Sequence, residues 1–123
     1  MTTRRAFIEA NGADCRNWRW SWSFVNHEEK SVIFGAWDQH KVPEGQVILA
    51  RSWRIHNGRV QPAFAESLEH IKLINSGFEL WTFPLHREEQ ENGTSIIRGF
   101  TPQLTRKLLM ADGERWLAVE PIE

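Results

Sequence analysis

Aromatic and basic side chains are the residues of this 123-residue sequence with the clearest capacity for chemistry. The chain has seven Trp, seven Phe and no Tyr, and its arginines outnumber its lysines eleven to four. Indole rings stack on bases or touch an apolar group such as a methyl, and planar guanidinium groups suit phosphates and guanine edges. The combination favours a module that binds nucleic acid. Because Trp and Arg also dominate protein interfaces, a protein- or peptide-binding module with an aromatic groove is the alternative.

Aromatic residues alternate with small or polar ones along the segment 17–25. The aromatic positions are Trp18, Trp20, Trp22 and Phe24. A period of two predicts a β-strand with all four rings on one face and Arg19 on the other. The rings then form either the inner face of a central strand or, in part, a recognition surface that reaches past the core.

Basic residues gather in two segments without acids, 46–65 and 92–111, although the net charge is only −1. The basic residues of these segments are Arg51, Arg54, Arg59, Arg98, Arg106 and Lys107. A nearly neutral protein with such segments can carry one anion-binding face. The alternative is that solvated charges cluster here by chance.

Signatures of catalysis are missing from the sequence. The five histidines do not have zinc-ligand spacing, and Cys15 has no CxxC partner. There is no GxSxG, P-loop or Rossmann glycine pattern. We therefore expect no enzyme activity, cofactor or metal in this chain. A small enzyme that uses Cys15 or His70 is a weaker alternative hypothesis. His70 itself is predicted to be a surface histidine. A quaternary-ammonium cage usually includes Tyr and an acid, and this chain has no Tyr.

The clearest predicted helix covers about 62–76. Its apolar stripe is Phe64, Leu68, Ile71 and Ile74, with Glu66, Glu69 and Lys72 on the solvent side. Pro62 suits the first turn and Gly77 the C-terminal cap.

Short strands and one further helix account for the other patterned segments. A short helix is expected over 3–10, and strands over 17–25, 31–37, 46–53, 78–83 (ended by Pro84), 95–101, 104–110 and 115–119, with exposed loops at 54–61 and 85–94. The first two strands and the last two are expected to form hairpins, and Gly35 indicates a bulge or a close backbone approach. The predicted fold is α+β: a mostly antiparallel sheet of five to seven short strands with one dominant helix.

The length predicts one domain over residues 1–120, with 121–123 as the start of a linker to a further C-terminal domain. A single cysteine cannot form an internal disulfide, which fits a reducing compartment. No apolar run approaches the roughly 18 residues of a membrane span. We expect a cytoplasmic protein without a membrane partner.

A resemblance to a known family rests on Val47-Ile48-Leu49-Ala50-Arg51-Ser52-Trp53, the Asn57-Gly58 loop, and the run from Ala65 to Ile71 with Ser76-Gly77. This part of the chain resembles the N-terminal specificity domains of McrA-type restriction endonucleases. Phe34-Gly35-Ala36-Trp37-Asp38 is also similar to the N-terminal regions of bacterial proteins that carry an HNH nuclease further along. The resemblance covers about half of the chain. It implies a domain that recognises modified duplex DNA, with an HNH nuclease as a separate C-terminal part; this chain has no HNH motif.

These lines together predict a binding domain for duplex DNA containing 5-methylcytosine or 5-hydroxymethylcytosine. The expected DNA-binding residues are Arg19, Arg51, Arg54, Arg59, Arg98, Arg106 and Lys107, and the expected contacts to the modified base are Trp18, Trp20, Trp37 and Trp53. The sequence leaves open whether the base is flipped out or read in the groove.

Overall fold

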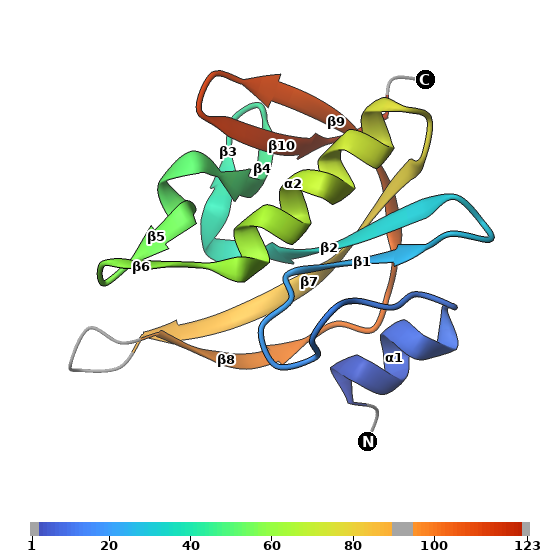
Figure 1. Cartoon of the computed structure of the whole chain (residues 1–123), viewed down its shortest axis with the longest axis horizontal. Coiled ribbons are helices and arrows are strands. Elements are labelled where there is room, and N and C mark those ends of the chain that lie inside the picture. The colour runs from blue at the N-terminus through green and yellow to red at the C-terminus, as the bar shows by residue number, and fades with distance from the viewer. Residues whose placement is uncertain (1–2, 90–94, 122–123) are drawn as a thin grey trace.

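The computed structural model describes residues 3–89 and 95–121. Within these residues the helices are α1 (Arg4–Ala10) and α2 (Pro62–Asn75), and two 3₁₀ turns are η1 (Asp38–His40) and η2 (Arg51–Arg54). The strands are β1 (Ser23–Asn26), β2 (Ser31–Trp37), β3 (Lys41–Val42), β4 (Gly45–Ala50), β5 (Ile55–His56), β6 (Arg59–Val60), β7 (Glu79–Glu89), β8 (Ser95–Phe100), β9 (Thr105–Asp112) and β10 (Arg115–Val119). Figure 1 shows α2 lying across the main sheet and α1 beyond β1. The predicted α+β class is confirmed.

The main sheet has the strand order β1-β2-β7-β9-β10-β4-β3, and β8 also pairs with β7. Among the described strands, β2 and β7 form the single parallel pair, from Ser31 opposite Glu79 to Trp37 opposite Leu85. A parallel pair needs a long crossover, which the chain between β2 and β7 supplies with β3 to β6 and α2. The sheet curls so that β4 also lies close to β2. The sheet is therefore mostly antiparallel, as expected, with one parallel pair between the edge strand β1 and the β9–β10 hairpin.

Two hydrophobic cores occupy the two faces of this central pair. Phe34 and Leu80 belong to the core under α2, together with Phe64 of that helix. Ile33 and Phe83 belong to the core on the α1 side. Successive side chains of a strand point to opposite faces, so a strand buried on both faces reads as a continuous apolar run. This explains the uninterrupted hydrophobic sequence of β2.

The predicted strand over 17–25 is wrong in its first half. Asn17 organises a turn: its carbonyl accepts the backbone N–H groups of Trp20 (3.2 Å) and Ser21 (2.9 Å). Its side-chain Oδ1 accepts the N–H of Arg19 at 2.8 Å. An asparagine that satisfies nearby N–H groups in this way competes with a strand ladder, and β1 begins only at Ser23. The aromatic rings therefore do not share one face.

Three other expected boundaries also change. The strand predicted over 46–53 ends at Ala50, because its partner β10 begins at Arg115, the residue opposite Ala50. The strand predicted to end at Pro84 continues to Glu89. On one side of β7, the pairing with β9 reaches Thr82 and the pairing with β8 starts at Leu85, so no ladder bond is lost where Pro84 lacks an N–H. The loop expected over 85–94 is therefore strand up to Glu89, and 90–94 lie outside the described residues.

The loop expected over 54–61 contains the β5–β6 hairpin, so that expectation is wrong, whereas the other expected elements are confirmed. The first helix, α2, the β1–β2 hairpin and the β9–β10 hairpin appear where the sequence placed them. Neither the bulge nor the close backbone approach expected at Gly35 is present, because β2 pairs without a register shift and the atoms nearest to a Cβ there are side-chain atoms, with Cδ1 of Leu85 at 2.3 Å. No described helix is both long enough and apolar enough to cross a bilayer.

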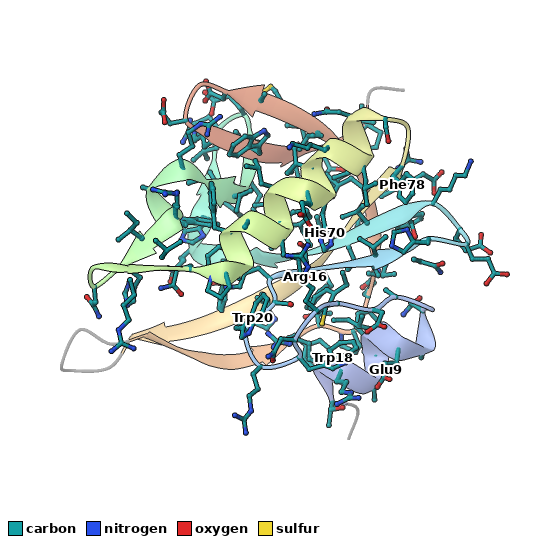
Figure 2. All side chains as sticks on the ribbon, in the orientation of Figure 1. Glu9, Arg16, Trp18, Trp20, His70 and Phe78 are labelled. Atoms are coloured by element: carbon teal, nitrogen blue, oxygen red, sulfur yellow. The ribbon has the colours of Figure 1, made fainter. Side chains whose placement is uncertain are left out.

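The solvent side predicted for α2 is wrong at two positions. Glu66 is 1% exposed and His70 is 8% exposed. Oε2 of Glu66 accepts the backbone N–H of Arg16 at 2.7 Å, and Nδ1 of His70 lies 2.6 Å from the hydroxyl oxygen of Ser23. Figure 2 shows Arg16 and His70 between α2 and the chain that leads into β1. These polar contacts bury a helix face that its periodicity assigns to solvent.

Stability should depend on pH through His70, because burial lowers the pKa of its imidazole. The unfolded chain binds this proton near pH 6.5, whereas the folded chain binds it only at lower pH. Between the pKa of His70 in the folded chain and its pKa in the unfolded chain, the unfolded state binds more protons. The contribution of neutral His70 to stability is therefore fully present above about pH 6.5 and is lost as the pH falls. We expect the urea midpoint to drop between pH 7.5 and pH 5, and to drop less in His70→Asn. The exposed His56→Asn variant should keep the native pH dependence; an unchanged dependence in His70→Asn would contradict the assignment.

Candidate nucleic-acid interface

A pocket of about 510 Å³ is lined by the 19–22 segment, by the last residues of β2 and by the middle of β7. Four indole rings line it: Trp20, Trp22, Trp37 and Trp53. All four side chains are partly exposed, so they are accessible to a ligand. The pocket therefore gathers most of the tryptophans of the chain around one hollow.

Ring contacts fix the orientation of the wall formed by η1 and η2. Trp53 meets Trp22 edge to face, with ring centroids 6.2 Å apart and an interplanar angle of 90°. On another side the ring of His40 lies 4.9 Å from that of Trp53. Aromatic side chains held in this way lose little further freedom when a ligand binds. The wall is therefore preorganised.

The floor of the pocket comes from the central strands. Gly35, Phe83 and Leu85 line it from β2 and β7, and Phe24 and Ile48 complete it. The missing side chain at Gly35 leaves the space that Leu85 occupies. The parallel register places Gly35 opposite Phe83 and Trp37 opposite Leu85, so floor and wall belong to the same pair of strands.

The charged residues of the pocket lining are basic. Arg4 of α1 and Arg19 reach it, together with His40 and His56. Among the described residues that line the pocket there is no Asp or Glu, and no described carboxylate pairs with Arg4 or Arg19. Burial lowers the pKa of Arg4, but a guanidinium stays protonated near neutral pH. The pocket therefore combines an apolar, aromatic interior with two arginines that are not paired with any carboxylate of the described residues.

The structure brings together four of the residues predicted from the sequence: Trp20, Trp37, Trp53 and Arg19. Arg54 ends η2 and Arg59 begins β6, so both belong to the basic segment beside the pocket; both are exposed, and no described carboxylate pairs with either. The η2–β6 segment and the pocket thus form one continuous surface.

Five other predicted residues are placed elsewhere or are not described. Trp18 stacks on Phe24 at 5.6 Å beneath the guanidinium of Arg5, and Figure 2 shows it near α1, away from Trp20. Arg51 lies over the ring of Trp116 and close to Glu114. Arg106 pairs with Glu79 at 3.0 Å, and Lys107 pairs with Glu120. The side chain of Arg98 lies outside the described residues.

Sequence reasoning missed Trp22, Arg4 and His40 as parts of this site. Trp22 carried a signal, because it belongs to the same aromatic alternation as Trp20. No sequence signal pointed to Arg4 or His40, because both lie apart from the aromatic segment along the chain. The positions of α1 and η1 in the fold bring them to the pocket.

A second, more open hollow of about 430 Å³ lies on the other side of the 14–16 segment, lined by Cys15, Glu66 and His70 among others. Burial is the main cause that raises the pKa of the Cys15 thiol, which keeps it protonated and weakly nucleophilic. No three His, Cys, Asp or Glu side chains of the described residues are grouped so as to hold a metal ion. The arrangement offers no activated nucleophile.

Comparison with known proteins finds no matching family model, no matching curated protein and no matching solved structure. The functional argument therefore depends on the geometry of the pocket and on the residues themselves.

Gly35 should be sensitive to substitution because of its contact with Leu85. We expect Gly35→Ala to lower the free energy of unfolding by about 1–3 kcal/mol, the usual range for overpacking a core. In a double-mutant cycle, Leu85→Ala removes the atoms that collide with the new Cβ, so the double variant should lose less than the sum of the single losses. Urea denaturation of the four proteins measures this. Additive losses would show that Leu85 does not limit the space at Gly35.

Proposed function

We propose that this chain is a reader domain for modified duplex DNA and that the aromatic pocket holds the modified base. The observation that carries the proposal is the composition of the pocket: four tryptophans, two arginines without described carboxylate partners, and no described acid. Rings provide stacking surfaces for a base, and the arginines provide contacts for the adjoining phosphates.

The size and shape of the pocket favour a base that has left the helix. Its volume of about 510 Å³ lies within the range of roughly 300–1,000 Å³ that is typical of small-molecule sites. A paired base presents only its edge in a groove, whereas a base that enters a concave pocket must leave the stack. Of the two modes of reading that the sequence leaves open, the pocket supports base flipping.

Discrimination of a modified cytosine needs only a small apolar contact. An additional methyl group is worth on the order of 0.8 kcal/mol when it is buried. Such a small free-energy difference distinguishes modified from unmodified cytosine only if the pocket walls do not move to fit both bases. The edge-to-face packing of Trp22 on Trp53 supplies a rigid wall. A 5-methyl or 5-hydroxymethyl group is therefore the proposed determinant.

Other ligands for an aromatic pocket fit less well. A quaternary ammonium cage normally combines rings with an acid, and the described lining of this pocket is basic. The competing hypothesis of a peptide groove differs in salt response, because binding to several phosphates weakens steeply with salt. The resemblance to McrA-type specificity domains supports the DNA assignment, with cleavage carried out by a separate nuclease domain in the cytoplasm.

The proposed function is tested by titrating labelled duplexes that differ only in one cytosine: unmodified, 5-methyl and 5-hydroxymethyl. We expect a modified duplex to bind most tightly, and Trp53→Ala to weaken that binding by roughly 5- to 150-fold, because base–ring stacking is worth about 1–3 kcal/mol. Trp81→Ala is the matched control, since Trp81 does not line the pocket and its Nε1 donates to Glu79. Equal affinity for all three duplexes would reject selective reading, and no binding at low salt would redirect the search to a protein partner.

The arginines of the pocket should contribute to the salt dependence of binding. We expect Arg19→Gln to reduce the slope of log K against log salt by about one, the value for one lost phosphate contact. Arg106→Gln serves as the control, because Arg106 is already paired with Glu79. If the Arg106 variant lost slope and the Arg19 variant did not, the phosphate-binding surface would lie at β9 and not at the pocket.

A further inference from the structure

The β5–β6 hairpin carries an unusual pair of exposed apolar side chains. Ile55 is 49% exposed and Val60 is 61% exposed, and the two residues are directly opposite each other in the ladder. In an antiparallel pair, opposite residues point to the same face. Leu108 on β9 is the one other large hydrophobic residue this exposed in the described part of the chain. Two of the three exposed large hydrophobic residues in the described part of the chain therefore lie on one face of this hairpin.

The hairpin is built to hold this face in place. Its turn is Asn57-Gly58 with φ values of 52° and 76°, which is the type of turn that matches the twist of a two-residue hairpin loop. The N–H of Gln61 donates to the carbonyl of Arg54 at 2.7 Å and extends the ladder beyond the two strand pairs. Figure 1 shows β5 and β6 extending outward at the N-terminal end of α2. A short, well-formed projection thus presents two aliphatic side chains to solvent.

The second face of the hairpin is basic. His56 and Arg59 are opposite each other in the ladder and alternate with the apolar pair, and both are exposed. Arg54 precedes the hairpin, and no described carboxylate pairs with Arg54 or Arg59. The charge therefore complements a phosphate backbone and not a basic or neutral partner.

The hairpin also adjoins the pocket directly. Ile55 and His56 contribute to the pocket lining beside Trp53. A base that enters the pocket leaves a gap in its helix, and this gap must lie close to the residues at the pocket rim. Ile55 of the apolar face and His56 of the basic face both lie at that rim.

We propose that the β5–β6 hairpin is a wedge that enters the duplex where the modified base has been extruded. Ile55 and Val60 occupy the vacated space between the neighbouring base pairs, while Arg54 and Arg59 contact the flanking phosphates. This inference rests on the proposed function, because it assumes that a base occupies the pocket. Proteins that insert apolar side chains between base steps unstack the duplex there, and the additional contacts in the deformed duplex offset that cost. The hairpin would act in the same way and would therefore favour the open state of the DNA.

A wedge is required only when a base must be taken out of a duplex. The test compares Val60→Ser with the native protein on two labelled probes: a duplex with one central 5-methylcytosine, and the modified strand alone. Val60 is chosen because Ile55 also lines the pocket, whereas Val60 does not. The base of the single strand is accessible without opening. We expect the variant to bind the duplex about tenfold more weakly, as expected for the loss of one buried aliphatic contact, and to bind the single strand with native affinity.

The control is Leu108→Ser, which removes an exposed hydrophobic residue of similar size from β9. It should leave both affinities unchanged, and circular dichroism should show native folding in every variant, because all the replaced side chains are exposed. Equal losses on the duplex and on the single strand, or no loss on either, would overturn the wedge while leaving the pocket assignment in place. Native protein that binds neither probe would overturn the proposed function and the wedge with it.

Discussion

The parallel pairing of β2 with β7 is the constraint on which the rest of the structure depends. The two strands lie side by side from Ser31 and Glu79 to Trp37 and Leu85, and their side chains enter a core on each face. Because the strands are parallel, the C-terminal end of β2 lies beside the middle of β7, which continues to Glu89. There Gly35 and Leu85 fit together so closely that no Cβ has room, and there the aromatic pocket opens.

A layer of buried polar contacts holds the mouth of the pocket in place. Ser23 lies within hydrogen-bonding distance of both His70 and Ser67, at 2.6 and 3.0 Å. Glu66 accepts the backbone N–H of Arg16, immediately before the turn that carries Trp20. Buried polar groups cost stability unless they have partners, and these contacts have specific geometry. The layer therefore ties the aromatic turn to α2 and sets the position of the rings.

The tryptophans divide according to the surfaces they serve. Trp116 is buried in the core beneath α2, and Trp18 stacks on Phe24 on the opposite face. Four others surround the pocket. The high tryptophan content thus has two structural explanations: packing in the cores and the lining of the pocket. The arginines divide in the same way: Arg106 is neutralised by Glu79, whereas Arg19 faces the pocket without a described acidic partner.

The sequence by itself determined the local elements and the chemical character of the site. Apolar periodicity located α2, and the Asn57-Gly58 dipeptide marked a turn, although the strands of the β5–β6 hairpin around it were expected to be a loop. The residue types indicated the aromatic rings and guanidinium groups that line the pocket. Such features depend on neighbours within a few residues, so they can be read directly from the chain. The tertiary structure alone decided that β2 and β7 are parallel and that Glu66 and His70 are buried. It also decided which side chains line the pocket: Trp22 and Arg4 do, whereas Trp18 does not. These outcomes depend on contacts between residues far apart along the chain, where packing and buried hydrogen bonds override the local pattern.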